Sequence, residues 1–400
     1  MPASVLKILH IAPTPFFADR GCHIRIRNEI ESLAERPVKV ILCTYHLGKD
    51  VSGIDIRRIP RIPGYKKLDA GYSPFKFPAD IFLFFLVLKT CLREQPDLLH
   101  GHLHEGALIG WAVKKILFWR SMPLIMDMQG SLSGELTSYG TVKSGGFVRR
   151  IVVRIEAMIC KMVDFFFCSS AESQNTLVTR FHVSPEKTTL LQDVVPDIFF
   201  LEQNKKGLRR KMGIPAGKKV VLYTGSLLSG KGVHFITRAM AGLLKVRDDL
   251  FFVLVGYPKD NVAAFIRKNG LEKYVLLPGQ VAYGDLPRWL SIADIALEPK
   301  ESDSGEASGK LLHYMAAGLP VVCFDTENNR KFLGEPGYYA RERTPLAFAR
   351  AILAAIEDRN GIGRGVRGRE RMQEQYSMPA LGKRLATAYE QMVRDGIVEI

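Results

Sequence analysis

Short apolar runs alternate with segments of helical periodicity along this chain, and the series begins twice. Strands separated by helices predict a parallel sheet that is covered on both faces. At 400 residues the chain is too long for one ordinary core, so each series is expected to form its own domain. The expected strands lie at 6–11, 38–44, 98–100, 124–126 and 165–168 in the first series, and at 220–223, 251–255, 274–277, 295–297 and 320–324 in the second.

The predicted fold class is therefore α/β, with two doubly wound Rossmann-like domains that face each other across a cleft. A polar stretch at 202–211 lies near the junction of the two series. We expect one domain over 1–198 and another over 199–379, and the helical segment 380–400 is left open to pack on either. Ligands of such sheets bind beyond the carboxyl ends of the strands, so the loops that follow strands are the candidate sites.

The chain is basic, with 56 Lys and Arg against 41 Asp and Glu, a net charge of +15. This balance favours anionic partners. The charge is spread over both halves and no nucleic-acid reader motif accompanies it, so no nucleic acid is expected. The densest basic stretch, 359–371, holds five arginines interrupted by glycines. It predicts a solvated loop before the last helices, with a phosphate or lipid-headgroup contact as the alternative.

The cysteines and the apolar runs indicate the compartment. The six cysteines form no C-x-x-C pair, which suits a reducing environment without disulfides. The longest apolar run, 81–88, is eight residues long, whereas a membrane-spanning helix needs about 20. The N-terminus carries no signal-peptide pattern. We therefore expect a cytoplasmic protein.

Glycines and a lysine follow the first expected strand of the second series. Gly225 and Ser226 permit close approach of a ligand, and Lys231 offers a point charge for a phosphate, although glycine loops without ligands are common. In the first series, Gly21 opens a helix, where it either binds an anion or makes a turn. Neither a dinucleotide fingerprint nor a P-loop is present, which disfavours a dehydrogenase and a P-loop NTPase.

A second polar loop in the second series opens a helix near Ser308. Ser308 and Gly309 can present backbone N–H groups to a diphosphate, as helix starts do. Lys310 and His313 are three residues apart and are expected on one helix face. Glu306 is placed to accept hydrogen bonds from sugar hydroxyls. The alternative is a surface helix that Ser308 caps, but two lysine-bearing loops in one half favour an anion site.

Histidines and an acidic residue follow strands in the first series. His102 and His104 are interpreted as substrate contacts or acid–base groups, with ordinary structure and metal ligation as alternatives. No second cluster of ligands has matching spacing, so no metal site is expected. Asp127 and Gln129 predict either substrate binding or a simple turn.

These residues together resemble a known family. The two-domain pattern, the loop Gly225 to Gly232 and the run Lys310-Leu-Leu-His313-Tyr-Met-Ala-Ala-Gly-Leu-Pro-Val-Val are similar to the family 4 retaining glycosyltransferases of the GT-B fold. The segments 169–173 and 193–197 are also similar, so the resemblance covers nearly the whole chain.

The resemblance implies a nucleoside-diphosphate sugar bound mainly by the second domain and an acceptor hydroxyl bound by the first. The sugar would be transferred with retention of configuration, and the leaving phosphate would take the acceptor proton. Cations and backbone dipoles would stabilise the diphosphate, so neither a metal nor another cofactor is implied. The implied catalytic residues are His102, Asp127, Lys231 and Glu306; the donor-binding residues are Gly21, Gly225, Ser226, Lys231, Glu306, Ser308, Gly309, Lys310 and His313; the acceptor-binding residues are His102, His104 and Gln129.

One departure from the family pattern keeps other functions open. The family often carries two glutamates separated by seven residues, and here the second position is His313 while the first falls on Gly305. A non-catalytic nucleotide-sugar or carbohydrate-binding protein and a GT-B sugar-nucleotide epimerase are the alternatives. The acceptor is left open between a lipid, a lipid-linked and a glycan hydroxyl. Segments 72–88 and 147–154 combine apolar and basic residues, which predicts either peripheral contact with an anionic membrane at its cytosolic face or an ordinary core.

Overall fold

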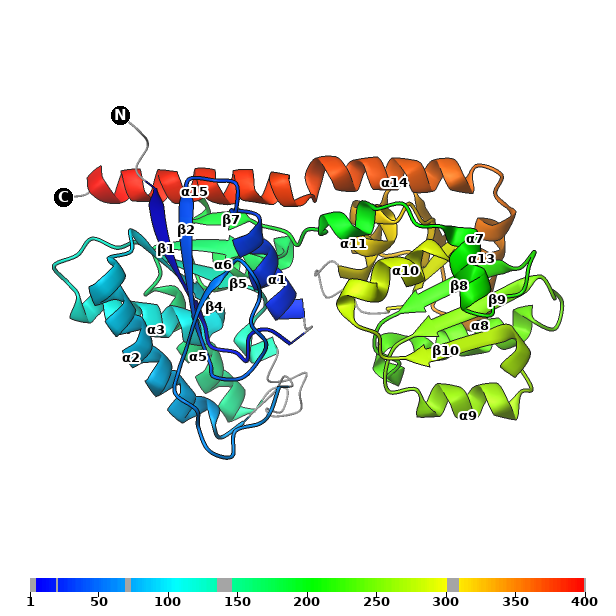
Figure 1. Cartoon of the computed structure of the whole chain (residues 1–400), viewed down its shortest axis with the longest axis horizontal. Coiled ribbons are helices and arrows are strands. Elements are labelled where there is room, and N and C mark those ends of the chain that lie inside the picture. The colour runs from blue at the N-terminus through cyan, green and yellow to red at the C-terminus, as the bar shows by residue number, and fades with distance from the viewer. Residues whose placement is uncertain (1–4, 19–20, 69–72, 135–145, 301–308, 399–400) are drawn as a thin grey trace. The chain divides into compact units, whose positions relative to one another are not determined.

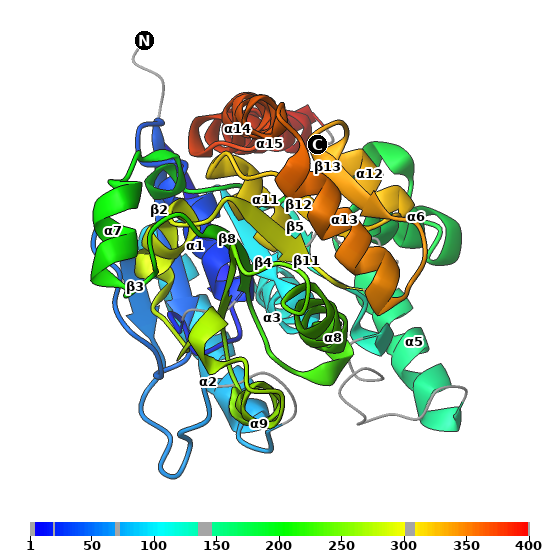
Figure 2. The same ribbon diagram turned by 90° about the vertical axis from the view of Figure 1, so that its right-hand side faces the viewer.

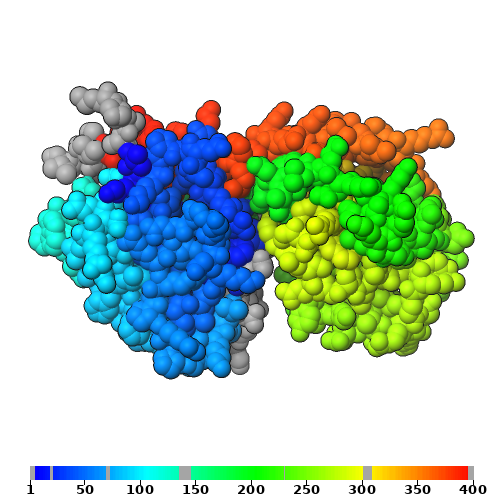
Figure 3. Space-filling view, viewed as in Figure 1, coloured from blue at the N-terminus to red at the C-terminus, as the bar shows by residue number. Residues whose placement is uncertain are grey.

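The chain forms two compact units, each built on one parallel β-sheet. The first unit combines Met1–Asp193 with Met378–Ile400, so the C-terminal segment returns to the N-terminal sheet, and the second unit is Val194–Ser377. In the space-filling view, red C-terminal residues reach the surface beside blue N-terminal ones (Figure 3). The computed structural model describes residues 5–18, 21–68, 73–134, 146–300 and 309–398.

The sheet of the first unit has seven parallel strands in the order β3-β2-β1-β4-β5-β6-β7. Its central strands are mostly apolar and show no regular alternation, which is typical of strands that are buried on both faces, but β1, β4 and β5 also contain buried polar residues. Their side chains are almost entirely buried. The strands are β1 (Leu6–Ala12), β2 (Val38–Thr44), β3 (Asp55–Arg58), β4 (Leu98–His102), β5 (Leu124–Met128), β6 (Phe165–Cys168) and β7 (Thr188–Leu190).

Helices cover this sheet, as Figure 1 shows. α2 packs on α3, and α3 packs on β4 and β5 and contacts α5, while the C-terminal helix α15 packs against α1. The segment 380–400, which the sequence left open, thus belongs to the first unit. The helices are α1 (Gly21–Glu31), α2 (Lys76–Glu94), α3 (Leu103–Ile116), α5 (Phe147–Cys160), α6 (Ala171–Arg180) and α15 (Met378–Val398), with a 3-10 turn η1 (Pro185–Lys187).

The sheet of the second unit has six parallel strands in the order β10-β9-β8-β11-β12-β13. Figure 2 shows α8 and α13 side by side over one face, and the two helices are in contact. The strands are β8 (Lys219–Thr224), β9 (Leu250–Val255), β10 (Val275–Gly279), β11 (Ile295–Glu298), β12 (Val321–Phe324) and β13 (Gly337–Ala340).

Eight α-helices surround the second sheet within the described residues. They are α7 (Lys205–Lys211), α8 (Val233–Leu243), α9 (Asp260–Lys268), α10 (Leu286–Ser291), α11 (Gly309–Ala316), α12 (Glu327–Leu333), α13 (Pro345–Glu357) and α14 (Gly361–Gln375). Short 3-10 turns are η2 (Asp197–Phe200), η3 (Ser229–Lys231), η4 (Glu272–Tyr274) and η5 (Tyr283–Asp285).

The basic stretch 359–371 lies largely in α14, so the prediction of a loop was wrong. Its glycines are spaced so that Gly361, Gly365 and Gly368 fall on one buried side of the helix. A Cβ added to Gly365 would lie 1.9 Å from the carbonyl oxygen of Gly318. Here glycine permits close packing of α14 on the turn after α11, and this advantage exceeds its cost of about 1 kcal/mol in a helix.

The prediction of two doubly wound parallel α/β sheets is confirmed. The strand order reverses between β1 and β4 in the first unit and between β8 and β11 in the second. Ligands of open α/β sheets bind at such reversals, beyond the carboxyl ends of the strands. In each unit, the candidate site is therefore at the carboxyl ends of the two strands that flank the reversal. Within the part of the chain described, no helix has the length and apolar character needed to cross a membrane.

Candidate functional site

Lys310 stands at the strand reversal of the second unit. It lies in the first turn of α11, and its Nζ donates a hydrogen bond to Oε1 of Glu298 over 3.1 Å. The same Nζ is 4.7 Å from the centroid of the Tyr223 ring, within range of a cation–π contact. Glu298 ends β11 and Tyr223 lies in β8, so this one amine joins both strands that flank the reversal.

Two further lysines contribute positive charge to the same place. Burial lowers the pKa of Lys310; the Glu298 carboxylate opposes this, and the charges of Lys231 and Lys300 lower the pKa further. The Glu298 carboxylate is almost fully buried, and it also accepts a hydrogen bond from the backbone N–H of Lys300 over 3.2 Å. Among the described residues, the charges of three lysines thus act at a place that holds one buried carboxylate, which suits a ligand with more than one negative charge.

Glycines let the loops around Lys310 touch through their backbones. Gly225 has φ 129°, and a Cβ built there would lie 3.1 Å from Cδ of Lys310. A Cβ on Gly256, after β9, would lie 1.8 Å from the carbonyl oxygen of Gly225. Gly232 has φ 76°, and its Cβ would lie 2.0 Å from the carbonyl oxygen of Pro299. Side chains at these positions would push apart the loops that hold the lysines.

Besides His313, the other residues predicted to bind the donor in the second unit are Ser226, Lys231, Glu306, Ser308 and Gly309. Glu306 and Ser308 lie outside the described residues. Gly309 begins α11, and Lys231 is exposed in η3. The backbone carbonyl of Ser226 accepts a hydrogen bond from the Tyr223 hydroxyl over 2.8 Å, which fixes the start of the loop after β8.

His313 has other partners than Lys310. Its ring stacks on Phe199 with a centroid separation of 4.2 Å, and its Nε2 lies 2.9 Å from the Tyr283 hydroxyl. Burial lowers the pKa of His313 to about 4. The imidazole is therefore neutral near pH 7 and supplies no charge to a diphosphate.

Replacing His313 with glutamine should make the second unit less sensitive to acid. The folded pKa of about 4 lies below the unfolded value of about 6.5, so the unfolded chain takes up a proton first and stability falls as the pH drops through this window. On going from pH 7.5 to pH 5, the free energy of unfolding should therefore fall by about 2 kcal/mol more in the wild type than in H313Q. Urea denaturation at both pH values, followed by Trp289 with Trp111 and Trp119 replaced by phenylalanine, measures it. An equal pH effect in wild type and H313Q would contradict the assignment.

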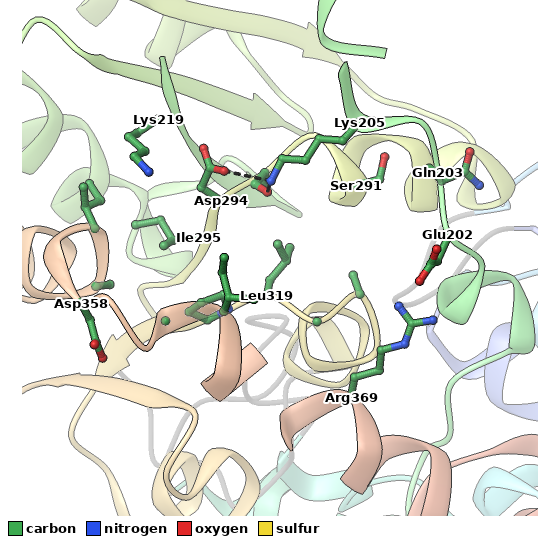
Figure 4. A pocket seen from close by; sticks show the side chains of 18 of the residues that line it. Glu202, Gln203, Lys205, Lys219, Ser291, Asp294, Ile295, Leu319, Asp358 and Arg369 are labelled. Atoms are coloured by element: carbon green, nitrogen blue, oxygen red, sulfur yellow. Dashed lines mark hydrogen bonds and ion pairs between the residues drawn. The ribbon is translucent and has the colours of Figure 1, made fainter. Parts of the chain in front are cut away.

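A pocket of about 670 Å³ also lies in the second unit, but at the amino ends of the strands, opposite to the ends where Lys310 lies. Lys219 and Ile295, which line it, stand at the amino ends of β8 and β11 (Figure 4). Several of its polar groups already have partners: Nζ of Lys205 lies 2.9 Å from Oδ1 of Asp294, as the dashed line shows, and Arg369 donates to the backbone carbonyl of Phe200. By the rule for open α/β sheets, this pocket is not the substrate site.

In the first unit, Asp127 forms the centre of a buried polar network. It accepts hydrogen bonds from Nη2 of Arg25 over 2.6 Å and from Nε2 of Gln129 over 2.7 Å, and it lies 3.3 Å from Nδ1 of His102. Burial would raise the pKa of Asp127, but the charge of Arg25 and the hydrogen bonds from His102 and Arg25 hold it well below its usual range. The carboxylate is therefore ionised and its position is fixed.

The loop positions predicted for His102 and Asp127 were wrong, because both residues lie inside strands. His102 ends β4, Asp127 lies in β5, and they are direct partners in the parallel pairing. The strand ends were inferred from the ends of the apolar runs, but β4 and β5 each continue two residues further. His104 lies in the first turn of α3, with Nε2 3.4 Å from Oε1 of the buried Glu156. Gly21 begins α1, where an added Cβ would meet nothing within 4 Å.

Four residues of these two places were not predicted from the sequence, namely Arg25, Glu29, His10 and Glu298. All four are buried charged or titratable residues. The only signal for Glu298 and His10 is a polar residue within an apolar strand. Arg25 and Glu29 lie in the amphipathic helix α1, where charged residues are usually exposed, so nothing in the sequence distinguished them.

Comparison with known proteins decides the family. Residues 20–192 match the glycosyl transferase 4-like domain, and residues 218–358 match glycosyl transferases group 1. The chain belongs to the group 1 glycosyltransferases. Its predicted identity as an enzyme of this class is confirmed.

Relatives of this glycosyltransferase match most of its length. D-inositol 3-phosphate glycosyltransferase from Thermobispora bispora is 22% identical over 92% of this chain and 89% of its own. Alpha-D-kanosaminyltransferase from Streptomyces kanamyceticus is 26% identical over 92% of this chain and 99% of its own.

Solved structures support the GT-B fold. Sucrose-phosphate synthase from Thermosynechococcus elongatus has a TM-score of 0.77 at 18% identity and covers 98% of this chain and 100% of its own. Anabaena HepE, solved with UDP and glucose, has a TM-score of 0.74 at 16% identity and covers 96% of this chain and 99% of its own.

Proposed function

We propose that this glycosyltransferase moves a sugar from a nucleoside-diphosphate sugar to a hydroxyl acceptor with retention of configuration. The observation that carries the proposal is the Lys310–Glu298 pair with Lys231 and Lys300 at the strand reversal of the second unit. A diphosphate is the ligand class that this charge and these glycine-lined loops suit. That HepE is solved with UDP and UDP-glucose on the same fold supports a nucleotide donor.

The chemistry follows from where charge develops. As the bond between the sugar and the diphosphate breaks, negative charge grows on the leaving oxygen, and fixed cations there lower the barrier. The Glu298 carboxylate holds the Lys310 amine in one orientation before the donor arrives. The leaving phosphate then takes the proton of the attacking hydroxyl. This scheme needs neither a metal nor another cofactor for the transfer.

The acceptor is proposed to bind at the carboxyl ends of β4 and β5 in the first unit. His102, His104, Asp127 and Gln129 lie there, and only Gln129 among these four is more than slightly exposed. Its amide is held by Asp127 over 2.7 Å, which leaves its carbonyl oxygen for an acceptor hydroxyl. The buried three would then set the position of Gln129 and of the strand ends.

A panel of UDP-, GDP- and ADP-sugars tests the donor. A donor that binds the native state raises the melting temperature. At a donor concentration of a hundred times Kd, the free energy of unfolding rises by about 2.7 kcal/mol. Turnover is followed as release of nucleoside diphosphate that depends on an added acceptor. No shift with any donor would overturn the proposal. Release of an epimerised sugar without acceptor would favour an epimerase, and binding without turnover over a broad acceptor panel would favour a binding protein.

The acceptor class is proposed to be a lipid or lipid-linked hydroxyl at the cytosolic face of a membrane. The helix α5 exposes Phe147, Ile151, Ile155 and Met158, which recur every three or four residues and form one stripe. Arginines at 149, 150 and 154 lie on the same helix. An exposed apolar stripe with flanking arginines is typical of a helix that lies in the interface of an anionic membrane.

Vesicles test this membrane surface. The double variant I151S/I155S should lower co-sedimentation with vesicles that contain anionic lipid about tenfold or more, because it removes most of the apolar area of two side chains from the interface. Leu346 is an exposed leucine on α13 of the second unit, and L346S serves as the matched control. Equal binding by I151S/I155S and wild type would exclude α5 as the contact.

A further inference from the structure

Three histidines and a glutamate meet in the interior of the first unit. His10 in β1 pairs in register with His100 in β4, and His102 follows two residues later on the same face of the sheet. Glu29 reaches them from α1. One ligand atom from each of the four lies within 4.8 Å of the others, and all four side chains are buried.

Part of this cluster has no hydrogen-bond partner among the described residues. Nε2 of His100 and Oε2 of Glu29 are buried without a hydrogen bond, while Oε1 of Glu29 forms an ion pair with Nε of Arg25 at 3.1 Å. Nε2 of His100 lies 3.9 Å from Oε2 of Glu29, which is too far for a direct bond. Buried polar atoms left unpaired cost about 1–3 kcal/mol each, so such a pair indicates a missing partner.

Outer hydrogen bonds orient the histidine rings toward this space. The Tyr389 hydroxyl lies 2.8 Å from Nδ1 of His100, and Oδ2 of Asp127 lies 3.3 Å from Nδ1 of His102. Both rings thereby direct Nε2 inward, and Nε2 of His102 lies 2.9 Å from Nδ1 of His10. Histidines that bind a metal through one nitrogen commonly donate the other N–H to a carboxylate or another oxygen in this way.

We propose that His10, Glu29, His100 and His102 bind one divalent transition-metal ion of the zinc class. Three imidazole nitrogens and one carboxylate oxygen form a closed tetrahedral set. In such a set, ligands at about 2.0–2.1 Å from the metal lie about 3.3 Å apart. The pairs at 2.9 and 3.9 Å need to move by about half an ångström to reach this separation, and no two of the four ligand atoms are more than 4.8 Å apart.

The charges of the surroundings also fit a divalent ion. Arg25 contacts three carboxylates: Nε lies 3.1 Å from Glu29, Nη2 lies 2.6 Å from Asp127 and Nη1 lies 2.8 Å from Asp193. Once a bound metal ionises Glu29, the three carboxylates carry three negative charges, which one guanidinium and one divalent cation balance. Arg25 keeps Asp127 and Asp193 when Glu29 turns to the metal.

The site fixes structure and does not take part in the transfer step. It joins β1, β4 and α1, and through Tyr389 it also holds α15 on the sheet. His102 is then a positioning residue, whose ring is fixed between the metal and Asp127.

The test uses the full chain, stripped with a chelator and then titrated with Zn²⁺ or Co²⁺. We expect one equivalent per chain by elemental analysis, a rise in melting temperature, and the visible absorption of tetrahedral Co²⁺. Glu29→Gln and His100→Gln should lose the rise and the absorption. E29Q keeps the shape of the side chain, and Arg25 retains Asp127 and Asp193 as counter-ions, so the variant should fold and be about as stable as the stripped wild type.

An exposed histidine provides the control. His182→Gln leaves the cluster untouched and should retain the full response to metal. A wild-type chain that shows no stoichiometric uptake overturns the proposal. So does an E29Q variant that takes up metal with the same affinity and the same Co²⁺ spectrum as the wild type, because the ion would then lie elsewhere.

Discussion

Replacing Lys310 with methionine is expected to lower turnover about 100- to 1,000-fold, as the loss of one group that stabilises transition-state charge does. Methionine retains the packing over Tyr223 but removes the amine that lies 3.1 Å from Glu298. Donor affinity should fall about 10- to 100-fold, since a hydrogen bond to a charged group is worth about 1.5–3 kcal/mol. Steady-state kinetics and donor-induced thermal shifts measure the two effects.

A second variant separates this role from a purely structural one. K310M leaves Glu298 buried without its cation, which should destabilise the second unit. The double variant K310M/E298Q removes both charges and should recover that stability. Donor affinity and turnover should stay low in it, because the diphosphate has lost its buried cation. Lys245→Met, at an exposed position, is the control. Recovery of turnover in the double variant would show that Lys310 only neutralises Glu298.

The sequence predicted this part of the site because its signals are local. Gly225 and Lys310 each follow an expected strand, and the reversal of strand order brings such loops together in any doubly wound sheet. Glu298 was not predicted, since a single acidic residue at the end of an apolar run has no distinguishing spacing. Its partner Lys310 is twelve residues away, and only the fold joins them.

The first unit shows a different limit. A histidine pair without a second cluster argued against a metal, yet the missing members His10 and Glu29 come from another strand and from a helix. Spacing rules detect ligands that lie close in sequence, whereas the strand register His10–His100 is a tertiary property. For the same reason, α14 was taken for a loop: the glycines that disfavour a helix in isolation permit its contact with Gly318.

Replacing Asp127 with asparagine is expected to destabilise the first unit by about 3 kcal/mol, because Arg25 keeps its charge in the interior and loses its closest counter-ion. The remaining contacts of Arg25 with Glu29 and Asp193 keep the loss from being larger. Urea denaturation in a Trp289→Phe background reports on this unit, since Trp111 and Trp119 both lie in it. Glu31→Gln is the matched control: its pair with Arg27 is partly exposed and should be worth about 0.5 kcal/mol or less.

The pH dependence of this difference identifies its cause. The folded pKa of Asp127 lies below the unfolded value of about 3.9, so its stabilising effect is fully present above that value and is lost as the pH falls toward the folded pKa. The gap between wild type and D127N should therefore be constant from pH 5 to 8 and narrow below about pH 4. A gap that is unchanged at low pH would mean that the shape of the side chain matters rather than its charge. The Arg25 network would then owe its stability to packing. The charge argument for a divalent ion in the buried histidine cluster would lose Asp127, one of the three carboxylates on which it rests.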